Sequence, residues 1–170
     1  GARVRRPSIQ ELLEAYAVRS ELESLGARLG IPRMTDADLA ELETLHEAMQ
    51  QAAEIGDRHE VAVHDADFHA RLLALAGNRT LESVWGSLEP FSRTYITLVA
   101  PGADARWTAD LHPRILAAVR SRDPEAVVAA LRHHFDEASA HLAEGWQQEP
   151  AADDRRPGPA ARRARGAAGA

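Results

Sequence analysis

Residues 61–73 read VAVHDADFHARLL, and this stretch predicts a helix whose apolar face carries two ionisable side chains. Phe68 and Leu72 recur at helical spacing on that face. Asp65 and His69 are four residues apart, so they project from the same face one turn apart. Ionisable groups on a core-facing helix side are costly unless they are paired or bind a metal. The stretch therefore indicates a buried polar site.

Two further histidines lie at matching distances from a predicted helix break at Asp123-Pro124. His112 precedes Asp123 by eleven residues, and His134 follows it by eleven. If the two arms fold back on each other, each histidine lies about 16 Å from the turn, at about 1.5 Å per residue. We therefore expect the two imidazoles at the same height of an antiparallel hairpin.

One carboxylate and three imidazoles converging inside a helical bundle are suitable ligands for a divalent transition metal. For a single histidine the alternative is a hydrogen-bonded core residue, but four side chains at compatible heights favour a metal. His64 and His133 fall on the opposite, solvent-facing sides of their helices. We expect one divalent ion per chain, with Zn²⁺ or Ni²⁺ as the candidates, and these predicted ligands: Asp65, His69, His112 and His134.

Composition limits the compartment and the partners. The chain has 170 residues, enough for one domain with a real core, and no cysteine, so any metal site must use nitrogen and oxygen donors. A formal net charge of −6 makes it a poor nucleic-acid binder by itself. No apolar run approaches the roughly 20 residues of a membrane span, and no signal peptide is visible. We expect a cytoplasmic protein that does not bind membranes.

The periodicity predicts an all-α fold, an antiparallel bundle of about six helices without strands. Caps and glycine or proline breaks delimit the helices. The predicted helices cover residues 8–29, 36–56, 57–77, 78–100, 105–122 and 124–146. In the fifth, Pro113 lies either near the true start of the helix or at a kink. Residues 8–146 would form the helical ligand- and metal-binding domain. Residues 147–170 lack apolar periodicity, and we expect them to form a disordered tail.

Arg19 lies on the first predicted helix between Tyr16, three residues before it, and Glu23, four residues after it. Arg19 and Glu23 could form an exposed ion pair worth a few tenths of a kcal/mol, about 0.2–0.5 kcal/mol. Alternatively, the guanidinium points into the bundle and binds a carboxylate through two parallel hydrogen bonds. The spacing alone does not separate these two interpretations.

Three segments carry a resemblance to a known family. They are RSELESLGA at residues 19–27, DADFHARLLALAGN at residues 65–78, and His112 followed twenty-two residues later by His134-Phe135. Together they resemble the C-terminal effector-binding (FCD) domain of FadR-type GntR transcription regulators over roughly residues 8–142. Six helices rather than seven would resemble the smaller, VanR-like branch.

The resemblance implies an antiparallel helical bundle that binds a small organic acid beside a metal held by one Asp and three His. It implies a homodimer that reaches DNA only through an N-terminal winged-helix domain, which is absent here. Residues 1–7 would be a remnant of that domain or of its linker, because residues 1–4 resemble the last strand of the wing. The expected effector is a small carboxylate metabolite, contacting Arg19, Tyr16 and Asn78.

The sequence therefore favours a ligand-sensing regulatory domain and no enzyme activity. The alternative is a metal-dependent enzyme of the helical-bundle type, for example a hydrolase. An enzyme would need a general base near the metal. The only further core-facing carboxylate is Glu23, which Arg19 is expected to neutralise.

Overall fold

The computed structural model describes residues 8–91 and 104–148. Within these ranges the chain is helical and contains no strand, which confirms the predicted all-α fold class. The elements are α1 (Ile9–Gly30), the short 3₁₀ helix η1 (Ile31–Arg33), α2 (Asp36–Glu54), α3 (Arg58–Ala74), α4 (Arg79–Phe91), α5 (Ala105–Asp110), α6 (Pro113–Ser121) and α7 (Pro124–Gln148).

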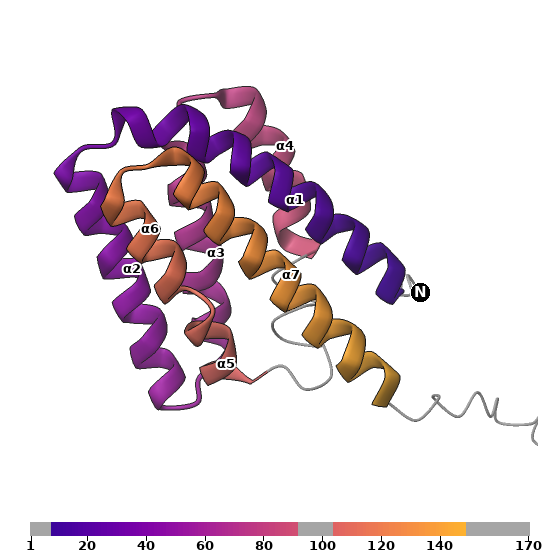
Figure 1. Ribbon diagram of the computed structural model, residues 1–170. Coiled ribbons are helices and arrows are strands. Elements are labelled where there is room, and N and C mark those ends of the chain that lie inside the picture. The colour runs from indigo at the N-terminus through magenta and orange to yellow at the C-terminus, as the bar shows by residue number, and fades with distance from the viewer. Residues whose placement is uncertain (1–7, 92–103, 149–170) are drawn as a thin grey trace, which may run out of the picture.

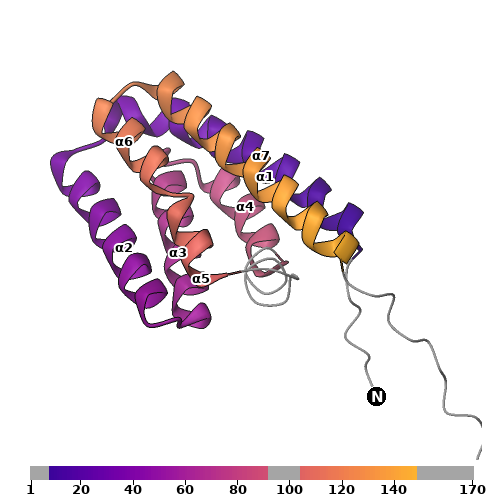
Figure 2. The same ribbon diagram turned by 60° about the horizontal axis from the view of Figure 1, so that its bottom comes forward.

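The helices form an antiparallel bundle around α3. The two longest helices, α1 and α7, lie side by side and run in opposite directions (Figure 1). Helices α2 and α3 form a second antiparallel pair, and α6 packs against α7 (Figures 1 and 2). The largest apolar cluster lies between α2, α3, α6 and α7, and fully buried members include Leu42, Phe68, Ile115 and Leu131.

The helix starts follow the capping signals in the sequence. The Ser8 side chain accepts a hydrogen bond from the Glu11 backbone N–H at 3.2 Å, and Glu11 accepts one from the Ser8 backbone N–H at 2.8 Å. This capping box satisfies two backbone donors that the first turn leaves free. Thr35 and Asp38 form the same arrangement at the start of α2.

The predicted helix over residues 105–122 is divided in the structure, and the second of its two helices starts at Pro113, one of the two roles predicted for this residue. Helix α5 ends at Asp110, and α6 begins at Pro113. Proline has no backbone N–H and its ring clashes with the preceding turn, so it starts a helix readily but interrupts one. His112 consequently stands at the N-cap of α6 rather than inside a longer helix.

Several predicted boundaries lie outside the described residues. These are the segment 1–7, the part of the fourth predicted helix beyond Phe91, and residues 149–170 of the predicted tail. Helix α7 continues to Gln148, two residues past its predicted end. The domain boundaries and the VanR-like branch therefore stay predictions. Among the described helices, none combines the length and the apolar content that a membrane span needs.

The end of α1 approaches the end of α3 closely at Gly30. A Cβ atom added at Gly30 would lie 2.5 Å from Leu75 Cβ and 2.7 Å from the Leu75 carbonyl carbon. Such distances leave no room for any side chain. A glycine at this position lets α1 pack directly against the backbone that follows α3.

Replacing Gly30 with Ala should therefore destabilise the fold. We expect Gly30→Ala to lower the free energy of unfolding by about 1–3 kcal/mol, because backbone atoms must move to admit the methyl group. Gly86 in α4 is the matched control, since an added Cβ there meets nothing within 4 Å. Gly86→Ala should raise stability by about 0.5–1 kcal/mol. Urea unfolding measures both, and equal effects of the two changes would contradict this packing.

Candidate metal centre

Three imidazoles from different helices meet in the interior of the bundle. His69 comes from α3, His112 from the start of α6 and His134 from α7, and their exposed fractions are 1%, 0% and 6%. One ring nitrogen from each lies within 4.8 Å of the others. The structure thus brings the three predicted histidine ligands together.

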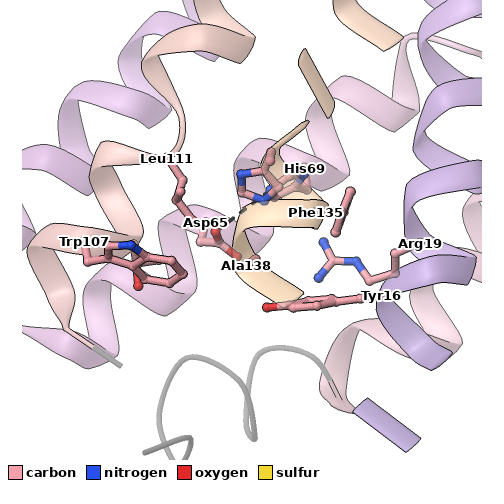
Figure 3. Close-up of a pocket in the computed structure, with 10 residues that line it drawn as sticks. Tyr16, Arg19, Asp65, His69, Trp107, Leu111, Phe135 and Ala138 are labelled. Atoms are coloured by element: carbon pink, nitrogen blue, oxygen red, sulfur yellow. Dashed lines mark ion pairs between the residues drawn. The ribbon is translucent and has the colours of Figure 1, made fainter. Parts of the chain in front are cut away.

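Asp65 completes this group from one turn before His69. Its Oδ1 atom lies 3.1 Å from His112 Nε2 and 3.9 Å from His69 Nε2. In Figure 3 the Asp65 carboxylate and the His69 ring point toward each other across the pocket. The side chain of Asp65 is 14% exposed, so this is the group's most accessible member.

The hairpin of α6 and α7 places two of the imidazoles at one height. The chain reverses at Arg122, whose left-handed φ of 57° ends α6 before Pro124 opens α7. The ring centroids of His112 and His134 lie 4.9 Å apart. This agrees with their equal predicted separation from the turn, although His112 sits at a helix N-cap.

The hydrogen bonds fix which nitrogen of two rings faces the centre. His69 Nδ1 lies 2.6 Å from Glu23 Oε2, and His112 Nδ1 lies 3.0 Å from the backbone carbonyl oxygen of Thr108. Both oxygens are acceptors, so each Nδ1 carries the proton and donates it. In the neutral rings, each Nε2 atom therefore presents a lone pair, and the two Nε2 atoms face each other at 3.2 Å.

This arrangement fits a divalent metal. Two lone pairs cannot hydrogen-bond to each other, but both can bind a cation between them. Ligands at 2.0–2.1 Å from a tetrahedral ion are about 3.3 Å apart, close to the observed 3.2 Å. His134 Nδ1 is buried and has no hydrogen-bond partner among the described residues. Imidazole and carboxylate donors suit Zn²⁺, Ni²⁺ and related ions.

The protonation states agree with this role. Burial raises the pKa of Asp65, but the contacts with the His112 and His69 rings outweigh it, so the pKa lies well below its usual range. Burial lowers the pKa of His134 well below its usual range, and His112 lowers it further. The centre therefore offers an ionised carboxylate and a neutral imidazole, which are the forms that bind metals.

Glu23 is buried and contacts the candidate ligand His69, a contact that the sequence did not predict. Its side chain is 1% exposed and accepts hydrogen bonds from Arg19, His69 and Trp85. The spacing allowed an exposed ion pair with Arg19 as one of two interpretations, and the pair forms but is buried, with Arg19 only 4% exposed. The guanidinium also lies 5.4 Å from the ring centre of Phe135. Arg19 therefore faces the bundle interior.

A small cavity adjoins the imidazoles on the side of α1 and α5 (Figure 3). Its volume is about 30 Å³, enough for one or two water molecules. Burial raises the pKa of Tyr16, whose hydroxyl therefore keeps its proton. Side chains that line the cavity include Tyr16, Arg19, Asp65, His69, Trp107 and His134.

The residues that line the cavity differ from the predicted effector contacts at Asn78 and Trp107. Asn78 does not line the cavity, because it caps α4 and its side-chain oxygen accepts a hydrogen bond from the Leu81 backbone N–H at 3.1 Å. Trp107 lines the cavity and stacks on His141 at a centroid distance of 3.9 Å. No pattern in the sequence pointed to Trp107 as a lining residue.

Comparison with known proteins assigns a family model to most of the chain. Residues 14–137 match the model described as FCD domain. A probable D-xylose utilization operon transcriptional repressor from Paenarthrobacter nicotinovorans is 31% identical over 144 residues, which cover 83% of this chain and 63% of that protein. The HTH-type transcriptional regulator McbR of Escherichia coli (strain K12) is 28% identical over 120 residues, covering 68% of this chain and 54% of that protein.

A solved structure of one of these relatives has a similar fold. The solved structure of E. coli McbR/YncC superposes with a TM-score of 0.74 at 24% identity, covering 83% of this chain and 72% of that chain. The chain spans less than two thirds of the two curated relatives, 63% and 54% of their lengths. Both relatives are transcription regulators by name, which agrees with the prediction that the chain is not an enzyme.

Adjacent histidines on α7 give a matched test of the centre. We expect Zn²⁺ or Ni²⁺ to raise the melting temperature of chelator-treated protein, because the ion binds only the folded state. His134→Ala should abolish this increase. His133→Ala should preserve it, since the His133 side chain is 37% exposed and pairs with Glu137 at 3.2 Å. Equal responses of the two variants in a thermal-shift titration would refute the ligand assignment.

Proposed function

Because the chain belongs to the FCD domain family of FadR-type GntR transcription regulators, we propose that it senses a small organic acid beside a bound divalent metal. The observation that carries this proposal is the 3.2 Å distance between His69 Nε2 and His112 Nε2, two buried atoms. Asp65, His69, His112 and His134 would hold the ion. The bound ion would supply a positive centre beside the cavity, which favours an anionic ligand.

The cavity beside the centre supports a compact anion as the effector. Asp65 cancels only one of the two charges of a divalent ion, and the Arg19 guanidinium also lines the cavity. The Arg19 guanidinium can share its donors with a carboxylate, whose shape matches the fork. The protonated Tyr16 hydroxyl is a further donor. A volume of about 30 Å³ means that the acid displaces water and moves nearby side chains.

A regulatory role is favoured over the hydrolase-like alternative. A hydrolase would need a free general base near the metal. Among the described residues, Glu23 is the further carboxylate next to the imidazoles, and donors from Arg19, Trp85 and His69 already occupy it. Glu23 is therefore not available to accept a proton from a substrate.

We propose that DNA is read by a winged-helix domain outside the present chain. Arg19 and Tyr16 both lie on α1, the first helix of the bundle. An acid that draws Arg19 toward the metal would bias the position of α1. This biases the affinity for DNA only if the acid binds the two positions of α1 with different affinity.

Helix α1 also offers a surface for a second copy of the chain. Val18 and Leu25 are seven residues apart and Leu29 is four further, so they share one face of α1. Their exposed fractions are 48%, 43% and 39%. This spacing is typical of helices that pair along their length. We propose that the α1 stripe, defined as Val18, Leu25 and Leu29, pairs with the same stripe of a second copy.

The effector proposal predicts a specific loss on changing Arg19. Calorimetric titration of small mono-, di- and tricarboxylic acids into metal-loaded protein should identify a ligand. Arg19→Lys keeps the charge beside Glu23 but loses the fork, so the affinity for that ligand should fall about tenfold or more. Arg132, which is 51% exposed on α7, is the control, and Arg132→Lys should bind as wild type. Equal affinities of all three proteins would exclude Arg19 from the binding site.

The dimer proposal predicts dissociation when charge enters the α1 stripe. Leu25→Glu should convert the dimer to monomer in sedimentation velocity, because a carboxylate would be buried without a partner. Ile55 is the control, an apolar residue 80% exposed at the end of α2 and away from the stripe. Ile55→Glu should leave the dimer intact. A Leu25→Glu protein that stays dimeric would place the interface elsewhere.

A further inference from the structure

The Glu23 carboxylate uses its two oxygen atoms for different partners. Oε1 accepts three hydrogen bonds, from Arg19 Nε at 3.2 Å, Arg19 Nη2 at 3.0 Å and Trp85 Nε1 at 2.8 Å. Oε2 accepts one, from His69 Nδ1 at 2.6 Å. Since Glu23 is 1% exposed, water cannot replace these partners freely.

We propose that Glu23 is a positioning residue for the metal centre, fixing the tautomer of His69 so that the unprotonated Nε2 faces the other ligands. This inference rests on the proposed metal site. Glu23 Oε2 requires the proton on His69 Nδ1, which leaves the lone pair on Nε2. That nitrogen lies 3.2 Å from His112 Nε2. A ligand whose other nitrogen is held in this way has its ring orientation and basicity set before metal arrives.

A purely structural ion pair between Arg19 and Glu23 would not need the contact with His69. The Arg19 donors and the Trp85 indole occupy Oε1, so the charge of Arg19 is met by that oxygen. Oε2 is left for His69. The division between the two oxygens therefore assigns Glu23 a task at the metal centre in addition to neutralising Arg19.

Replacing Glu23 with Gln separates the contact with Arg19 from the contact with His69. The amide has one acceptor oxygen, and the three donors at the Oε1 position favour placing it there. The amide NH₂ group then faces His69 Nδ1, which must become an acceptor. The proton of His69 moves to Nε2, where it blocks metal binding. In the opposite amide orientation, the NH₂ group would face three other donors, which is unfavourable.

Glu23 also connects the metal centre to two further helices. Glu23 lies on α1, and its partner Trp85 lies on α4 and is 5% exposed. His69 on α3 reaches both through one carboxylate. A movement of α1 away from α3 would lengthen the hydrogen bond to His69, so the position of α1 and the metal affinity would be coupled.

The test compares wild type, Glu23→Gln and the control Glu21→Gln, whose side chain is 67% exposed on the same helix. Zn²⁺ affinity is measured by chelator competition. We expect Glu23→Gln to lose about ten- to a hundredfold in affinity and Glu21→Gln to match wild type. Metal-free Glu23→Gln is checked for native helicity by circular dichroism, so that loss of folding is not mistaken for loss of a ligand.

The nitrogen NMR shifts of His69 give a readout that does not depend on metal. At about pH 8, above the ordinary imidazole pKa of about 6.5, wild-type His69 should carry its proton on Nδ1, and in Glu23→Gln on Nε2. A wild-type His69 protonated on Nε2 would overturn the inference, even if the variant does not fold. Wild-type Zn²⁺ affinity retained in folded Glu23→Gln would also overturn it and leave the proposed metal site intact. No Zn²⁺ binding by wild type would instead refute the proposed function.

Discussion

The candidate metal site depends on one contact, in which His69 Nε2 and His112 Nε2 face each other at 3.2 Å. Each belongs to a ring whose other nitrogen donates to a fixed oxygen, so neither ring can turn to hydrogen-bond the other. Lone pairs this close in a buried site repel unless a cation lies between them. The nearby Asp65 carboxylate adds negative charge to the same point. A divalent metal bound between the two nitrogens would relieve both effects.

The fixed oxygens come from parts of the fold that are far apart in sequence. Glu23 belongs to α1, whereas the Thr108 carbonyl belongs to α5 and lies four residues before His112. The third imidazole, that of His134, is placed by the return of α7 along α6. Packing the helices correctly therefore also assembles the ligands. Metal binding and folding are expected to be coupled for this reason.

Much of this arrangement could be predicted from local patterns. Apolar periodicity identified the helices, and the equal separations from Asp123 predicted that His112 and His134 would meet. The neighbour His133 lies toward solvent, as its helix face predicted. These successes share a cause, because helix geometry relates sequence spacing to position directly.

The remainder depends on contacts that spacing does not encode. The Arg19–Glu23 pair was visible in the sequence, but its burial depends on how α4 and α7 cover α1. The type of a residue alone does not predict its role, as Asn78 illustrates. Its side-chain amide could bind an acid, but it caps α4 instead. Trp85 reaches Glu23 across sixty-two residues of sequence, a contact that only the tertiary packing creates.

X-ray absorption spectroscopy of the zinc-loaded protein tests the central claim most directly. If the facing imidazoles hold the ion, the spectrum should show nitrogen and oxygen ligands at about 2.0–2.1 Å together with the outer-shell scattering of three imidazole rings. A spectrum with oxygen ligands alone, or with a single imidazole, would mean that the ion binds elsewhere on the chain. The three buried histidines would then be a hydrogen-bonded core cluster rather than a metal centre.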